Sequence, residues 1–156
     1  MNSPAQSTPR IAKPVYNVGV NATGPLSIES AKPENRAARA VIDCCYKIHK
    51  ELGPGLLESL YEAALAHELV KLGHVVRRQQ PIPVVYDGIK FQEGFRADLL
   101  VDNVLIVEIK SIEAVAPIHF KILMTYLRLS NIRLGLMVNF NEVLLKNGIK
   151  RLANGL

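Results

Sequence analysis

The 156-residue chain lacks the features that mark membrane and secreted proteins. No hydrophobic run approaches the roughly 20 residues that a membrane helix needs, so the sequence predicts no membrane span. The N-terminus carries no charged stretch followed by an apolar segment, and we therefore expect no export signal. The only cysteines, Cys44 and Cys45, are adjacent in a predicted helix and poorly placed for a structural disulfide. A reducing cytoplasmic location fits these absences.

Motifs of several enzyme classes are also missing. No Cys-x-x-Cys or His-Glu-x-x-His pattern occurs, and His67 and His74 have no partners at metal-ligand spacing, so the sequence predicts no zinc site. There is no glycine-rich phosphate loop, nucleophile elbow or Cys/His dyad. Aromatic residues do not alternate with basic ones, which argues against a stacking platform for single strands.

Positive charge is concentrated in the C-terminal third. The chain has a formal net charge of +5 at pH 7, and residues 121–156 alone account for it, with six basic side chains against Glu142. Such a segment fits a polyanionic partner, and a merely solvated basic surface is the alternative. The candidate nucleic-acid-binding residues of this segment are Lys121, Arg128, Lys146, Lys150 and Arg151.

The pattern along the chain predicts a tail and one domain. Residues 1–33 hold five of the nine prolines and are expected to form a disordered tail, and residues 34–156 a single domain with its own core. Apolar periodicity predicts helices over 34–52, 56–72 and 117–130, strands over 74–78, 82–86, 91–101, 104–109 and 133–139, and a short amphipathic helix within 142–156. This order predicts an α/β sandwich with a mixed central sheet of about four to five strands flanked by helices.

The most informative polar residues lie at the end of the predicted strand 104–109. Residues 104–107 are apolar on both faces, which is typical of a buried central strand. Glu108 and Lys110 are two apart and so project from one face, where burying their charges costs free energy unless something uses them. An ion pair at the strand end is one explanation. The other adds Asp98 from the preceding strand: two carboxylates could hold a divalent cation beside a lysine, as phosphodiester hydrolysis requires.

That second explanation makes a prediction about strand register. A two-residue hairpin loop, Asp102-Asn103, would pair Asp98 with Val107 and turn Glu108 to the opposite face. We therefore predict a three-residue connection over 102–104, or a bulge of equal effect, so that both carboxylates share a face.

Several motifs together resemble a known group of enzymes. Asp98 followed by Glu108-Ile109-Lys110 is similar to the PD-(D/E)xK signature of restriction-endonuclease-like nucleases. Residues 55–61 read GxxExxY, the motif that names a bacterial family within that superfamily. Residues 49–53, 96–100 and 125–127 also match words of that family, so the resemblance covers about residues 38–153. It implies a restriction-endonuclease-like αβ sandwich.

The resemblance also implies a reaction and roles for residues. It implies a Mg²⁺- or Mn²⁺-dependent nuclease that acts on nucleic acid, and we expect its substrate to be DNA. Asp98 and Glu108 match the metal ligands, Lys110 the group that orients or activates the attacking water, and all-oxygen ligands suit Mg²⁺. Glu58 matches a further acid that reaches the metal or its water, although a glutamate in an ion pair at the margin of the apolar stripe remains the alternative.

Five more residues are candidates for supporting roles at the site: His49, Tyr61, Arg96, His119 and Tyr126. His49 either borders the site or packs at a helix end. His119, just after Pro117, could meet a phosphate at a helix N-terminus.

One position departs from the family pattern. Many members carry Gln four residues before the tyrosine of the third helix, and this chain has Ile122 before Tyr126. Gln can hydrogen-bond water or substrate, whereas Ile cannot, and we expect Ile122 to complete the apolar stripe of that helix. The departure leaves open a weak or inactive module that binds nucleic acid or a protein partner. The sequence leaves a homodimer, RNA as substrate, and internal or terminal cutting open as well.

Overall fold

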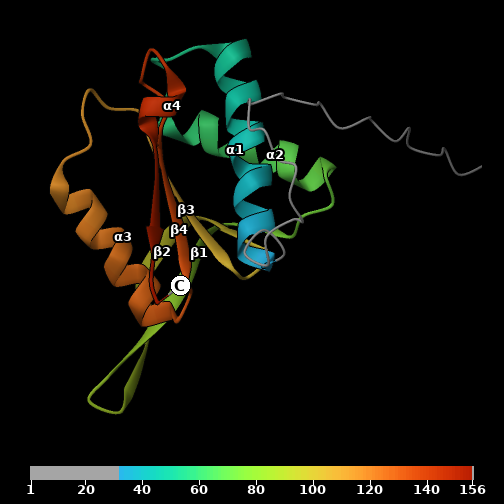
Figure 1. Ribbon diagram of the computed structural model, residues 1–156. Helices are drawn as coiled ribbons and strands as arrows, with labels where there is room; N and C mark the ends of the chain where they lie inside the picture. The colour runs from blue at the N-terminus through green and yellow to red at the C-terminus, as the bar shows by residue number, and fades with distance from the viewer. Residues whose placement is uncertain (1–31, 156) are drawn as a thin grey trace, which may run out of the picture.

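The computed structural model describes residues 32–155, so the tail expected over 1–33 lies outside the described residues except for its last two positions. Two helices come first, followed by three strands, a helix, a strand, a short helix and a last strand (Figure 1). The elements are α1 (Pro33–Leu52), α2 (Glu58–Lys71), β1 (Val76–Tyr86), β2 (Ile89–Val101), β3 (Leu105–Lys110), α3 (Pro117–Ser130), β4 (Leu134–Asn139), α4 (Leu145–Gly148) and β5 (Ile149–Ala153).

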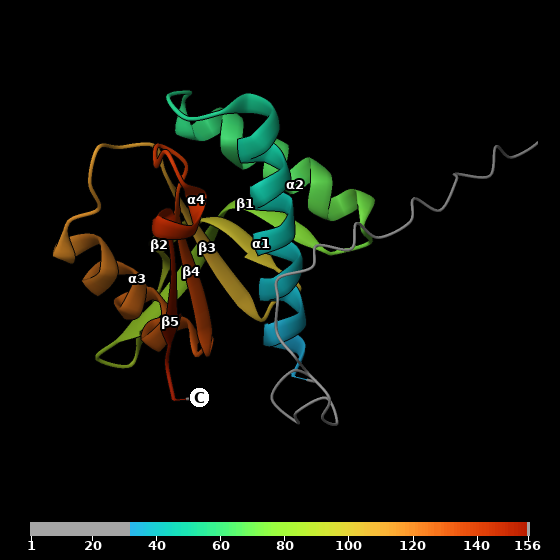
Figure 2. The same cartoon turned by 45° about the horizontal axis from the view of Figure 1, so that its top comes forward.

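The five strands form one mixed sheet in the order β1-β2-β3-β4-β5. β3 and β4 are parallel, with α3 as their crossover, and the other neighbours are antiparallel. Helices α1 and α2 cover one face and α3 the other (Figure 2). The predicted α/β architecture with a mixed sheet flanked by helices is therefore confirmed.

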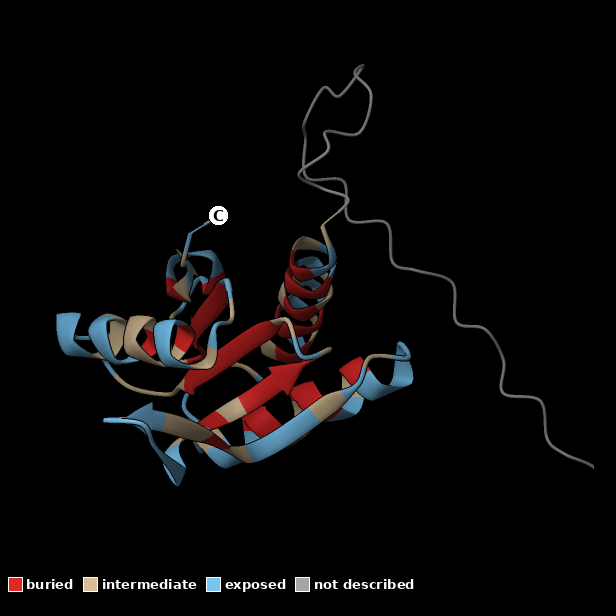
Figure 3. Cartoon of the chain, turned by 90° about the horizontal axis from the view of Figure 1, so that it is seen from below, coloured by how far each residue is buried: buried red, intermediate tan, exposed pale blue. Residues whose placement is uncertain are grey.

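The core explains why β3 and β4 read as apolar on both faces. All six residues of β4 and the first five of β3 are buried, because a separate apolar layer packs on each side of these strands. Figure 3 shows burial concentrated on the central strands and exposure on the hairpin of β1 and β2. No helix in the described part of the chain is long and apolar enough to cross a membrane.

Two predicted elements differ from the structure. The strands expected over 74–78 and 82–86 are one strand, β1, with a register shift between Ile82 and Val84. β1 lies at the sheet edge, where Pro81 and Pro83 are tolerated because a missing N–H breaks no central ladder. The segment expected as an amphipathic helix contains the four-residue α4 and then β5, which pairs with β4. Periodicity missed β5 because its sequence, Ile-Lys-Arg-Leu-Ala, does not alternate apolar and polar residues.

Candidate active site

The site lies where β2 and β3 separate. Their pairing runs from Val101 opposite Leu105 to Leu99 opposite Val107, and one further step in this register sets Asp98 opposite Glu108. Residues 102–104 form the connecting turn, with positive φ at Asp102 and Asn103. The predicted three-residue connection is therefore present, and register does not divide the two carboxylates between the faces.

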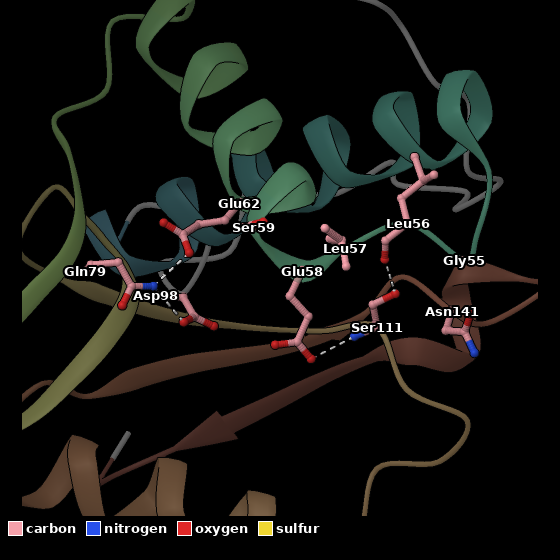
Figure 4. Close-up of a pocket in the computed structure, with 10 residues that line it drawn as sticks. All are labelled: Gly55, Leu56, Leu57, Glu58, Ser59, Glu62, Gln79, Asp98, Ser111 and Asn141. Carbon is pink, nitrogen blue, oxygen red and sulfur yellow. Dashed lines mark hydrogen bonds between the residues drawn. The ribbon is translucent and has the colours of Figure 1, made fainter.

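Asp98 occupies the position where the ladder stops. Beyond Leu99 the backbone N–H of Ile109 donates to Asp98 Oδ2 at 2.8 Å. Asp98 Oδ1 accepts a hydrogen bond from Gln79 Nε2 at 3.1 Å (Figure 4). Both oxygens are thus oriented, and each keeps a lone pair for another partner.

Glu108 is a buried carboxyl group that lacks a full set of partners. Only 8% of the residue is exposed, and within residues 32–155 its Oε1 has no hydrogen-bond partner. Burial, and then the charge of Asp98, raises the pKa of Glu108 to about 8, against the opposing effect of Lys110. An unpaired buried carboxylate oxygen costs free energy, and a bound cation would remove that cost.

Lys110 is the half-buried last residue of β3, two positions beyond Glu108. The ion pairs among the described residues do not include one between Glu108 and Lys110, so the strand-end ion pair considered from the sequence is not formed. Lys110 still acts on Glu108 at longer range, because its charge lowers the pKa of that carboxyl.

Glu58 begins α2 and reaches toward the end of β3. Its Oε1 accepts a hydrogen bond from the backbone N–H of Ser111 at 3.1 Å, and Ser111 Oγ donates to the carbonyl of Leu56 at 2.6 Å. Glu58 and Asp98 line one pocket of about 810 Å³. Among the described residues Glu58 takes part in no ion pair, which is the alternative that the sequence left open.

The same pocket contains residues that sequence reasoning missed. Glu62 is buried, and its carboxylate accepts hydrogen bonds from Arg78 Nε at 2.9 Å and Gln79 Nε2 at 2.8 Å. Its only signal in the sequence is a spacing of one helical turn from Glu58. The pocket is lined by Gly55, Leu56, Leu57, Glu58, Ser59, Glu62, Gln79, Asp98, Ser111 and Asn141 (Figure 4).

Tyr61 shapes the loop that leads to Glu58. Its ring is fully buried and stacks on Phe140, with ring centroids 4.3 Å apart. Its hydroxyl donates to the carbonyl of Gly53 at 2.6 Å and accepts from the N–H of Leu56 at 3.2 Å. Tyr61 therefore fixes the geometry of the loop that leads to Glu58.

Tyr61→Phe should lower the free energy of unfolding by about 1–3 kcal/mol, because two backbone groups lose their partner. The matched change Tyr46→Phe, at a residue 41% exposed, should have almost no effect. Thermal unfolding of both variants checks this, and equal melting temperatures would contradict the assigned role of the hydroxyl.

Two other supporting candidates, Tyr126 and Arg96, differ in how far they are buried. Tyr126 stacks on Phe95, with ring centroids 3.9 Å apart. Burial, and then the charges of Glu108 and Asp98, raise the pKa of its hydroxyl. Arg96 is exposed on β2, two residues before Asp98.

The two histidine candidates each form a hydrogen bond with a backbone group. His49 Nε2 lies 2.7 Å from the carbonyl oxygen of Glu142, so it ties the end of α1 to the segment after β4. His119 Nδ1 accepts a hydrogen bond from the N–H of Ala116 at 3.0 Å and so closes the first turn of its own helix.

The five basic candidates do not share one surface. Lys150 pairs with Met137, which packs under α3, whereas the next residue, Arg151, pairs with a residue of the opposite core layer. Arg151 Nη2 donates to Asn35 Oδ1 on α1 at 2.8 Å. Lys121 and Arg128 are exposed on α3, and Lys146 is exposed on α4. Adjacent strand residues point to opposite faces, so one segment serves two sides of the sheet.

The donor set fits a hard cation that keeps much of its water. Among residues 32–155, no group of three or more His, Cys, Asp or Glu side chains gathers to hold a metal by itself. Mg²⁺ commonly binds through one or two carboxylates plus waters and substrate phosphates, which is the role open to Asp98 and Glu108. The unpaired Oε1 of Glu108 and the raised pKa of that carboxyl fit such an ion.

Comparisons with known proteins agree with this geometry. The family model described as PD-(D/E)XK nuclease superfamily matches residues 35–152, which include every charged residue discussed at the site. Searches of curated proteins and of solved structures found no match.

Proposed function

Since this chain belongs to the PD-(D/E)XK nuclease superfamily, we propose that it hydrolyses phosphodiester bonds in DNA with the help of Mg²⁺ or Mn²⁺. The observation that carries the proposal is the buried Glu108, whose Oε1 has no protein partner within the described chain and which the register sets opposite Asp98. Keeping two carboxyl groups close together at the end of a buried strand costs desolvation free energy, and a bound cation would offset that cost.

Each residue then has a role in the proposed reaction. Asp98 and Glu108 would hold the ion, which lowers the pKa of water and offsets charge on the phosphate when bound. Lys110 would orient the attacking water through its Nζ hydrogens and can exchange a proton there. Glu58 would provide a further acceptor from α2, where Ser111 already holds one of its oxygens.

We also assign the chain to the GxxExxY family within the superfamily. The three defined residues of that motif differ in what they do in this structure. Gly55 has a φ of +93°, Glu58 lines the pocket, and Tyr61 holds the loop through its hydrogen bond to Gly53. A positive φ of this size favours glycine. We keep the cytoplasm as the proposed location, because the buried Cys44 and Cys45 are both unpaired.

The direct test is an assay on plasmid, single-stranded DNA and RNA with Mg²⁺, with Mn²⁺ and with EDTA. We expect DNA cleavage with either ion and none with EDTA. A protein that binds DNA but never cuts it would replace the nuclease proposal by the second candidate, a binding module for nucleic acid or a protein partner. The observation that favours this second candidate is that Ile122 stands where the family pattern has Gln, because Ile cannot hydrogen-bond water or substrate.

The structure corrects the expected packing of Ile122. It does not complete a buried stripe, since it is 40% exposed, and the buried residues of α3 are Leu123 and Leu127. Ile122 lines a surface hollow with Tyr126, whose hydroxyl has a pKa raised by burial and then by the charges of Glu108 and Asp98. A side chain here is therefore free to be polar.

Ile122→Gln should raise the cleavage rate about 10-fold, because an amide at this place can hydrogen-bond water or substrate. Its melting temperature should stay close to that of the parent, because no buried contact is removed. Leu129→Gln, at a residue 42% exposed on the same helix, is the matched control and should leave the rate unchanged. An unchanged rate in Ile122→Gln would show that the missing amide does not limit the site.

The basic residues on the α3 side should contribute most to DNA affinity. Ile106, Glu108 and Lys110 are spaced two apart, and Ile106 packs under α3, so Lys121 and Arg128 share that side with the site. The double change Lys121→Ala with Arg128→Ala should weaken DNA binding and reduce the slope of log K against log salt by about two. Arg151→Ala should have a smaller effect, and anisotropy titrations at several salt concentrations compare them.

A further inference from the structure

Gln79 has a backbone conformation that its sequence neighbours do not explain. Its φ is +48°, and of the non-glycine residues with positive φ in the described chain it alone lies inside a strand. The neighbouring pairs Arg78–Leu99 and Gln80–Ala97 remain in register, so the distortion is confined to one residue, opposite Asp98. Such conformations persist where surrounding contacts hold them, and they concentrate at functional sites.

The contacts of the Gln79 side chain account for the distortion. Its Nε2 donates to Glu62 Oε2 at 2.8 Å and to Asp98 Oδ1 at 3.1 Å, although the residue is exposed (Figure 4). An amide nitrogen has two hydrogens, and here one serves each carboxylate. The amide thereby places a donor between the two acidic groups, and each carboxylate accepts one of its hydrogens on one oxygen.

Glu62, which accepts one of the two hydrogen bonds from the Gln79 amide, is itself held in place. It is 6% exposed, and Arg78 Nε donates to its other oxygen at 2.9 Å. The resulting chain of contacts runs from Arg78 through Glu62 and Gln79 to Asp98, whose second oxygen is held by the N–H of Ile109. One oxygen of Asp98 is therefore oriented by backbone and the other by the Gln79 amide.

We propose that Gln79 is a positioning residue, whose amide aims the Asp98 carboxylate at the divalent metal. This inference rests on the proposed metal-dependent function. Groups that orient a metal ligand through a hydrogen bond typically change metal affinity or activity 10–100-fold when they are replaced. An amide suits the task because it donates at every pH and adds no charge between two carboxylates.

The test compares two glycine substitutions on the same strand. Gln79→Gly removes the amide and relieves the positive φ, so this variant should keep a melting temperature near that of the parent. Its dissociation constant for Mn²⁺, measured by calorimetric titration of the full chain, should rise about 10–100-fold. Gln80→Gly removes a side chain whose amide donates to the carbonyl of Pro81 at 3.4 Å, and its Mn²⁺ affinity should equal that of the parent.

Gln79→Met provides a second variant if the glycine variant fails to fold. It keeps the backbone strain and nearly the length of the side chain but lacks the N–H donors, so we expect the same loss of Mn²⁺ affinity. In cleavage assays, both Gln79 variants should need about 10–100-fold more metal for half-maximal rate, while the rate at saturating metal stays near that of the parent.

The possible outcomes separate the two proposals. Parent-like Mn²⁺ affinity in both Gln79 variants would overturn the positioning role and leave the nuclease proposal standing. A loss in Gln80→Gly equal to that in Gln79→Gly would also overturn it, because the effect would then belong to the strand. No Mn²⁺ binding by the parent would overturn the metal-dependent function and this inference with it.

Discussion

Lys110→Ala should lower the rate of DNA cleavage by at least about 100-fold. This is the smallest loss expected when a side chain that transfers a proton in the reaction is removed. Lys110 ends the buried strand β3, two residues beyond Glu108, and among the described residues it forms no ion pair with that carboxylate. Its ammonium is therefore available to water or phosphate at the site. Single-turnover cleavage at saturating Mg²⁺ measures the effect.

DNA affinity should change little in Lys110→Ala, because phosphate contacts are spread over many charges and each contributes about one counterion. Lys90→Ala, at an exposed residue near the start of β2, makes the same change of charge away from the pocket and should cleave like the parent. A parallel fall of affinity and rate in Lys110→Ala would assign this lysine to binding and contradict a role in the chemical step.

Glu108→Gln should stabilise the metal-free protein at pH 9 and have little effect at pH 4. The pKa of Glu108 is raised from its ordinary value of 4.5 to about 8, so the folded state keeps a proton that the unfolded state releases. Stability should thus fall as pH rises from about 4.5 to 8, with the full penalty above 8 and none below 4.5. One pKa unit is about 1.4 kcal/mol, which sets an upper bound of roughly 5 kcal/mol.

Chemical unfolding of parent and variant across this pH range checks the prediction. Glu113→Gln, at an exposed residue after β3, is the matched control and should follow the parent curve. Mg²⁺ should raise the melting temperature of the parent at pH 8 and not that of Glu108→Gln, because only an ionised carboxyl group binds the ion well. If the free energies of unfolding of parent and Glu108→Gln depended on pH in the same way, the raised pKa of the buried Glu108 would be refuted.

The carboxylate pair of the site follows from local sequence patterns. A run of apolar residues on both faces predicts a central strand, and the spacing of Glu108 and Lys110 then follows from strand geometry. The requirement that Asp98 share a face with Glu108 predicted the three-residue turn, which the register confirms. These inferences succeeded because each depends on residues close together in the chain.

Other features of the site required contacts between distant segments. Glu62 and Gln79 are 17 residues apart, and Ser111 is 53 residues from Glu58, so no sequence period relates them. The exposure of Ile122 and the division of the basic residues between two faces likewise depend on where α3 and β5 pack.

The sequence by itself thus determined the helices α1, α2 and α3, the strands β2, β3 and β4, and the position of the carboxylates beside the end of β3, because apolar periodicity and strand spacing act over a few residues. The tertiary structure decided which neighbours hold those carboxylates. Only packing brings α2 and the edge strand β1 to the end of β3, where Gln79 takes its strained conformation between Glu62 and Asp98.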